Sequence, residues 1–157
     1  MPSPNPFRFL VDDAASMSTR TIRLEGDLDE RVDLGQLGKL AGARMRIDLS
    51  GVTRINSAGV HRWVLCLEIL TKGRQVELCR CSSAFVAQAL MIPNMIAGAR
   101  VESVFLDYWC EPCEQNEVVL VASVADLQTR PQCPRCHSVL EPDTAGSLVE
   151  FFFRRAI

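Results

Sequence analysis

The spacing of the hydrophobic positions changes several times along the chain, and each change predicts a new element. Alternating apolar and polar residues, typical of half-buried strands, give way to apolar residues every three or four positions, typical of amphipathic helices. The expected strands are 7–11, 19–24, 44–49, 75–81 and 100–106, and the expected helices are 30–40, 57–70 and 83–91. Asn56 or Ser57 can cap the second helix, and Pro93 ends the third. This order predicts an α/β fold with a mainly parallel sheet.

The pattern changes again near residue 108, where two aromatic residues precede a cysteine-rich stretch. Residues 118–124 predict a strand, and residues 127–132 predict a loop. The stretch 144–155 carries Leu148, Phe151 and Phe152 on one helical face, but Phe153 interrupts that face, so a strand is the alternative. We therefore expect a domain over 1–108 and a smaller segment over 109–157 whose last element packs back on the domain.

Four cysteines of this segment form two Cys-x-x-Cys pairs. The first is Cys110 and Cys113, and the second, after 19 intervening residues, is Cys133 and Cys136. Each pair can aim two sulfurs at one point, and this spacing is typical of a tetrathiolate zinc ribbon. Four thiolates leave no open coordination position, so a structural Zn²⁺ is expected. The second pair and His137 also match a c-type haem attachment motif, but the matching first pair favours zinc.

Composition limits the possible partners and compartments. Of 157 residues, 48% are hydrophobic, and the net charge of −2 gives no electrostatic footprint for nucleic acid. Residues 1–6 lack the basic-then-apolar pattern of a signal peptide, and no apolar run approaches the ~18 residues of a membrane span. We therefore expect a cytoplasmic location, where cysteines are thiols or metal ligands. No phosphate-binding loop or nucleophile motif occurs, so an enzyme is not expected.

The stretch 47–60, Ile-Asp-Leu-Ser-Gly-Val-Thr-Arg-Ile-Asn-Ser-Ala-Gly-Val, closely resembles the central motif of the STAS domain, the family of bacterial anti-sigma factor antagonists. The family pattern runs Asp-Leu-Ser, a valine two residues on, then Ile-Asp-Ser-x-Gly before a helix. The matching positions are Asp48, Leu49, Ser50, Val52, Ile55, Ser57 and Gly59. Upstream, residues 24–29 resemble the family's Gly-x-Leu-Asp segment after the second strand. The resemblance covers about residues 7–107.

The resemblance implies a STAS-like sheet with helices packed on one side, followed here by the zinc-ribbon-like segment. It implies a bacterial regulatory protein that binds a protein partner, typically a serine kinase of the anti-sigma type. The partner-binding surface would comprise Asn56, Ser57, Ala58, Gly59, His61 and Arg62. Ser57 matches the serine that is phosphorylated in many members to control release of the partner. The family's last helix is due after residue 107, and 144–155 is the stretch that would supply it.

Two alternatives stay open. Asn56 stands where the family usually has aspartate, so Ser57 can also be a helix cap in a scaffold that binds partners without phosphorylation. Oxidation of the zinc thiolates would instead make the protein a redox sensor. The sequence predicts neither the identity of the partner nor the oligomeric state.

Overall fold

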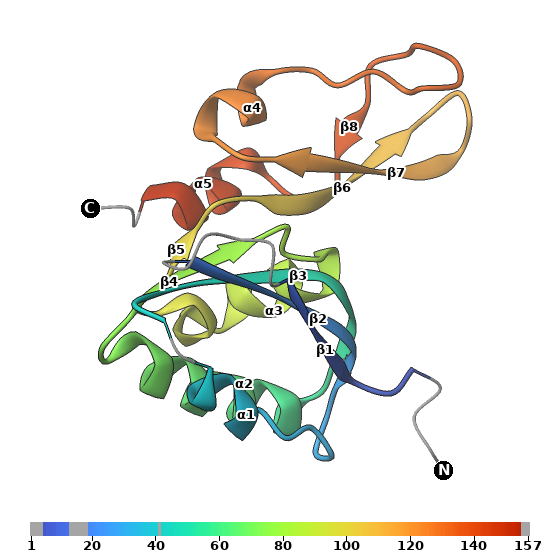
Figure 1. Ribbon diagram of the computed structural model, residues 1–157. Helices are drawn as coiled ribbons and strands as arrows, with labels where there is room; N and C mark the ends of the chain where they lie inside the picture. The colour runs from blue at the N-terminus through green and yellow to red at the C-terminus, as the bar shows by residue number, and fades with distance from the viewer. Residues whose placement is uncertain (1–4, 13–18, 41, 155–157) are drawn as a thin grey trace.

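A computed structural model describes residues 5–12, 19–40 and 42–154 of the chain (Figure 1). The larger of its two sheets has five strands in the order β1-β2-β3-β4-β5. Their bounds are β1 Arg8–Asp12, β2 Thr19–Leu28, β3 Arg44–Ile55, β4 Gln75–Cys79 and β5 Arg100–Val101. β1 is antiparallel to β2, and the other neighbours are parallel. The expected α/β class with a mainly parallel sheet is thus confirmed.

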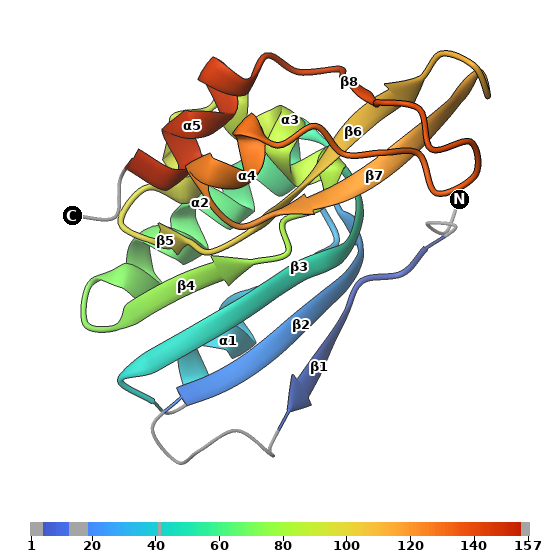
Figure 2. The same ribbon diagram turned by 90° about the horizontal axis from the view of Figure 1, so that it is seen from above.

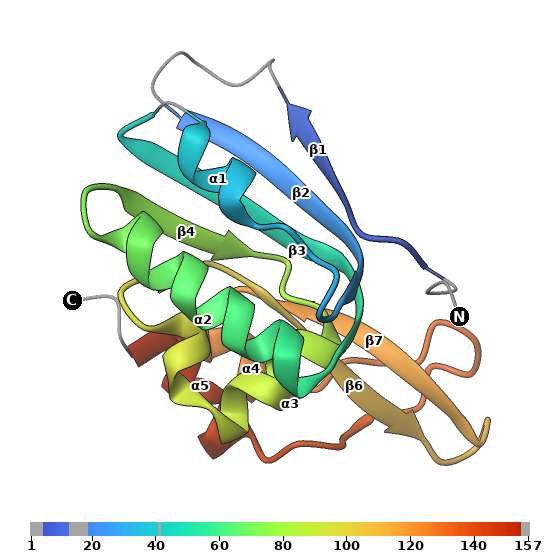
Figure 3. The same ribbon diagram turned by 90° about the horizontal axis from the view of Figure 1, so that it is seen from below.

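Three helices lie against one face of this sheet, as Figure 3 shows. They are α1 (Gly35–Lys39), α2 (Ser57–Thr71) and α3 (Ser83–Met91), and a 3₁₀ turn, η1 (Pro93–Ile96), follows α3. Ser82 caps α3 by accepting a hydrogen bond from the N–H of Phe85. Alternate residues of the strands join Trp63 and Phe85 in a core of fully buried side chains that includes Ile22, Leu24, Met45, Ile47, Leu49 and Leu67. The indole N–H of Trp63 donates to the carbonyl oxygen of Met95 at 2.8 Å, so this polar group is buried with a partner.

The other face of the sheet is polar, and Figure 2 shows no helix over β1, β2 and β3. Arg23 and Glu25 form an ion pair at 3.0 Å on β2. Arg100 and Glu77 form another at 3.3 Å between β5 and β4. This apolar-inside, polar-outside alternation is what a sheet covered on one face requires.

A second sheet of three antiparallel strands lies above the first in Figure 1. Its strands are β6 (Val104–Cys110), β7 (Gln115–Val121) and β8 (Glu141–Pro142), and it is accompanied by α4 (Val124–Gln128) and α5 (Gly146–Arg154). The expected boundary after residue 108 falls inside β6, and buried residues of both sheets belong to one continuous hydrophobic core. No helix within the described residues has both the length and the apolar character needed to cross a bilayer.

Two element predictions in the first part of the chain were wrong. The expected helix over 30–40 is reduced to α1, because the Asp29 and Asp33 carboxylates accept hydrogen bonds from the N–H groups of Arg31 and Gly35 and form turns instead. The expected strand over 100–106 is divided into β5 and β6. The division lies at Ser103, whose hydroxyl accepts from the N–H of Arg80 at 2.8 Å.

The C-terminal part also differs in detail from the prediction. The strand expected over 118–124 is β7, which begins at Gln115, and the loop expected over 127–132 begins as the last turn of α4. The final element is a helix, α5, so the strand alternative was wrong; residue 155 lies outside the described residues. Its buried face is formed by Val149 and Phe152, whereas Leu148 is 57% exposed.

Candidate functional site

The four paired cysteines converge on one point in the second sheet. Cys110 ends β6, Cys113 lies in the turn before β7, and Cys133 and Cys136 lie in the loop before β8. Their four sulfurs lie within 4.8 Å of one another, and none is in a disulfide. The Sγ atoms of Cys110 and Cys136 are 3.4 Å apart, and those of Cys113 and Cys133 are 3.9 Å apart. The predicted cluster of four candidate metal ligands is therefore confirmed.

Each of the two turns that carry the cysteines contains a residue in the left-handed region. Glu114 and His137, each directly after the second cysteine of its pair, have positive φ angles of 51° and 61°. In the second turn the N–H of His137 donates to the carbonyl of Cys133 at 2.9 Å. The N–H of Cys113 likewise donates to the sulfur of Cys110, and the N–H groups of Cys136 and Arg135 donate to the sulfur of Cys133. These turns stabilise thiolates and point both sulfurs of a pair inward.

The surroundings lower the pKa of two of the four thiols and raise the pKa of the other two. Hydrogen bonds from the hydroxyl and N–H of Ser138 lower the pKa of Cys136 to about 6, and those backbone N–H groups lower the pKa of Cys133. The adjacent sulfur of Cys136 raises the pKa of Cys113 to about 12, and burial raises the pKa of Cys110. Four thiolates this close repel one another, so full deprotonation requires a bound cation.

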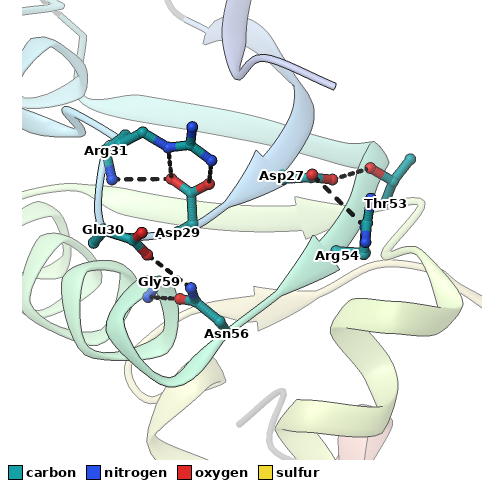
Figure 4. A network of polar contacts seen from close by, with 8 residues as sticks. All are labelled: Asp27, Asp29, Glu30, Arg31, Thr53, Arg54, Asn56 and Gly59. Atoms are coloured by element: carbon teal, nitrogen blue, oxygen red, sulfur yellow. Dashed lines mark hydrogen bonds and ion pairs between the residues drawn. The ribbon is translucent and has the colours of Figure 1, made fainter. Parts of the chain in front are cut away.

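A second candidate site surrounds the first turn of α2 (Figure 4). Asn56 is the N-cap, and its side-chain oxygen accepts from the N–H of Gly59 at 2.8 Å. Its side-chain nitrogen donates to the carboxylate of Glu30, also at 2.8 Å, and this hydrogen bond lowers the pKa of Glu30. Of the two predicted caps, Asn56 is confirmed and Ser57 was wrong, because Ser57 is the exposed first residue of the helix and the side chain of Asn56 makes the capping hydrogen bond.

Several acidic side chains lie beside this turn, at the carboxyl ends of β2 and β3 (Figure 4). Asp29 holds Arg31 in an ion pair at 2.7 Å, and Arg31 lowers the pKa of the Asp29 carboxyl. The nearly buried Asp27 accepts from the hydroxyl of Thr53 at 2.7 Å. Glu30 had no place in the predicted site because 30–40 was expected to be helical. The parallel arrangement of the expected strands could have indicated Glu30, because parallel strands bring their carboxyl ends to one edge of a sheet.

The six residues predicted to bind a partner differ in exposure. Asn56, Ser57, His61 and Arg62 are exposed, Ala58 is half-buried, and Gly59 is buried. A Cβ atom at Gly59 would lie 2.0 Å from the carbonyl oxygen of Leu28, so this position brings α2 into backbone contact with the end of β2. The exposed part of the predicted partner-binding surface is therefore formed by the four exposed residues, and Gly59 is buried below them.

An open hollow of about 530 Å³ adjoins Ser57 between α2 and the end of α3. Its lining combines apolar and amide side chains: Ile55, Ser57, Val60, His61, Val64, Gln88, Ile92 and Asn94. The exposed serine therefore lies at the rim of a hollow that can accept an apolar side chain.

No family model matches the chain, and a comparison with curated proteins also finds no match.

Proposed function

We propose that this chain is a cytoplasmic bacterial regulator of the STAS type that binds a serine kinase of the anti-sigma type through the start of α2. Ser57 is the phosphoacceptor, the cysteine cluster holds a structural zinc ion, and the chain itself is not an enzyme. The observation that carries the proposal is the exposed Ser57 on the first turn of a capped helix, inside the Asn-Ser-x-Gly motif. Further support is the uncovered surface around it, formed by Asn56, His61 and Arg62.

The position of Ser57 suits a charge switch. Backbone N–H groups at the start of a 15-residue helix favour an added anion, so a phosphate there is compatible with the fold. The same group adds a charge of about −1.5 to −2 to the partner-facing surface. Acidic groups that a partner presents to the hollow beside Ser57 would then be repelled, and apolar groups there would strip water from the phosphate at a cost in free energy. Phosphorylation would therefore release the partner without unfolding the regulator.

The geometry of the cysteine cluster suits zinc. Zinc–sulfur bonds of about 2.3 Å in a tetrahedron separate neighbouring sulfurs by about 3.8 Å. The two sulfur–sulfur distances of 3.4 and 3.9 Å bracket this value. A four-sulfur site leaves no position for substrate, so zinc here would cross-link β6, the turn before β7 and the loop before β8. This cross-link would stabilise the second sheet, which is small and whose strand β8 has only two residues.

One observation favours the alternative of a scaffold that is never phosphorylated. The carboxylate of Glu30 is hydrogen-bonded to Asn56, the residue next to Ser57. A phosphate on Ser57 would add two negative charges beside an existing one, which raises the cost of the modification. In this reading the α2 surface binds its partner constitutively, and the second sheet offers another contact surface.

The first test is the intact mass of the protein purified from its own cells, measured under native and denaturing conditions. The proposal predicts a zinc-sized increment that disappears on denaturation and an increment of about 80 Da that maps to Ser57. The Ser57→Ala variant should lack the second increment and keep the first. Zinc without phosphate under several growth conditions would favour the scaffold.

The second test measures partner binding. Ser57→Asp introduces a negative charge at the position of the phosphate, and Ser57→Asn is the neutral control of the same size. The proposal predicts that a serine kinase co-purifies with the wild type and Ser57→Asn and is lost with Ser57→Asp. Equal recovery with all three proteins contradicts the switch and is the result that the scaffold predicts.

A further inference from the structure

We propose that β1 is an interface between two copies of this chain, which pair antiparallel through their β1 strands and join their five-stranded sheets into one. This interface would lie at the edge of the first sheet, whereas the cysteine cluster lies in the second sheet. It is independent of the proposed function. It rests on the exposure of β1, on the order of its side chains, and on the hollow beside it.

Among the described residues, β1 is the longer edge strand of the first sheet. Within the described residues it pairs only with β2, whereas the opposite edge strand, β5, has two residues and is contacted by α5. Edge strands are usually protected by charged side chains, proline, a bulge or a very short length. β1 has five residues, carries charges only at its two ends and no proline, and exposes 47% of Leu10 and 40% of Val11. Such an edge is suited to receive another strand.

The sequence of β1, Arg-Phe-Leu-Val-Asp, is complementary to itself when it is reversed. In an antiparallel pair with a twofold axis at Leu10, Arg8 of each copy lies opposite Asp12 of the other. Phe9 of each copy lies opposite Val11 of the other, and the two Leu10 side chains meet on the axis. Opposite charges and apolar pairs directly across two strands are the favourable combinations in antiparallel sheets. The twofold symmetry makes the Arg8–Asp12 and Phe9–Val11 contacts occur twice, and the Leu10 contact on the axis occurs once.

The antiparallel pairing would also place the side chains of the second β1 on the same two faces of the sheet as those of the first. Arg8, Leu10 and Asp12 are opposite Glu25, Arg23 and Thr21 on the polar face of the sheet. The Arg8 guanidinium, already 3.1 Å from Glu25, would extend the charge pattern of this face to the second copy. Phe9 and Val11 are opposite the buried Leu24 and Ile22, on the face that carries the helices.

A hollow of about 650 Å³ lies on the helix side of this edge. Its lining combines apolar side chains, Phe7, Phe9 and Val32 among them, with charged ones that include Asp27, Asp29 and Asp33. A second β1 would bring its Val11 beside Phe9 and cover part of the apolar side chains. The pairing would thus continue both the polar face and the apolar layer of the sheet.

The pair should be reversible, because five-residue strands bury less than the roughly 1,200 Å² of a stable interface. We expect sedimentation velocity of the full chain to show a shift from monomer to dimer between about 10 µM and about 1 mM. Leu10→Lys and Leu10→Glu each place like charges on the twofold axis and should be monomeric throughout this range. An equimolar mixture of the two variants should recover the dimer, because lysine then faces glutamate. Leu10→Thr, a good strand former without charge, is the control that should still pair.

Two results would overturn the proposal. A wild type that stays monomeric at the highest concentration excludes the interface. A dimer that persists in Leu10→Lys but is lost in Ile69→Lys or Leu120→Lys shows that the copies associate through α2 or β7, where these residues are 68% and 47% exposed. The far-ultraviolet circular dichroism of each variant should match that of the wild type, since all three positions are exposed.

Discussion

The side-chain amide of Asn56 donates to the carboxylate of Glu30 at 2.8 Å and so joins the start of α2 to the segment after β2 (Figure 4). The oxygen of the same amide accepts from the N–H of Gly59. Aspartate could make the second contact but not the first, because an ionised carboxylate has no proton to donate. The amide at position 56 is therefore matched to the acidic residue at position 30.

Replacing Asn56 with aspartate should destabilise the protein at pH 7. The cap would remain, but two carboxylates would face each other in place of one hydrogen bond. We expect a lower Tm for Asn56→Asp and recovery in the double variant Asn56→Asp/Glu30→Gln, where glutamine can donate to the new aspartate. Thermal unfolding followed by circular dichroism measures both.

The pH dependence gives the control for this prediction. The hydrogen bond from Asn56 lowers the pKa of Glu30 in the folded state, so its contribution is present above the unfolded pKa of about 4.3 and is lost as the pH falls through the folded pKa. The difference in Tm between wild type and Asn56→Asp should therefore shrink in acid. An equal difference at pH 7 and pH 3 would contradict the assignment to repulsion between two carboxylates.

Substitution of Gly59 should be costly, although the change adds only one methyl group. The new Cβ would lie 2.0 Å from the carbonyl oxygen of Leu28, and two backbones would have to separate. We expect Gly59→Ala to lower the free energy of unfolding by about 3 kcal/mol, at the upper end for overpacking. Gly38→Ala is the matched control, because its Cβ meets no atom within 4 Å and alanine favours the helix. Urea unfolding of both variants tests this, and equal stability of the two would contradict it.

Local patterns predicted part of the fold. Asn56 caps α2 as its residue type favours, and the spacing of the four cysteines was sufficient to bring their sulfurs together. The shortened helix over 30–40 came from local turns at Asp29 and Asp33, which its apolar spacing did not reveal. Other failures came from contacts between residues distant in sequence. The division between β5 and β6 depends on a hydrogen bond from Arg80 to Ser103, and Glu30 reaches the site through Asn56, 26 positions later. Apolar spacing carries no signal for such contacts.

Oxidation distinguishes a structural zinc site from a redox sensor. Cys136 is the exposed cysteine of the cluster, whereas Cys110 and Cys133 are buried. A bound metal ion protects thiolates, so we expect mild peroxide to leave the zinc content unchanged, with Cys136 the first ligand oxidised only at higher doses. Zinc release measured with a chromogenic chelator tests this. Release in step with loss of the Cys136 thiol at low peroxide would instead favour the sensor.

Removal of the proposed zinc ion should unfold the second sheet and spare most of the first. Structural zinc contributes about 10–16 kcal/mol to folding in small zinc peptides, more than the few contacts of a two-residue β8 can replace. We expect Cys113→Ser, or chelation of the wild type, to remove hydrogen-exchange protection from β7, β8 and the end of β6. Protection of β2, β3 and α2 should persist, because none of the four clustered cysteines lies in these elements. Cys66→Ser is the control, since its sulfur lies beside the carbonyl of Leu34 and outside the cluster. Loss of protection throughout the chain would show that the continuous core couples the two sheets into one folding unit.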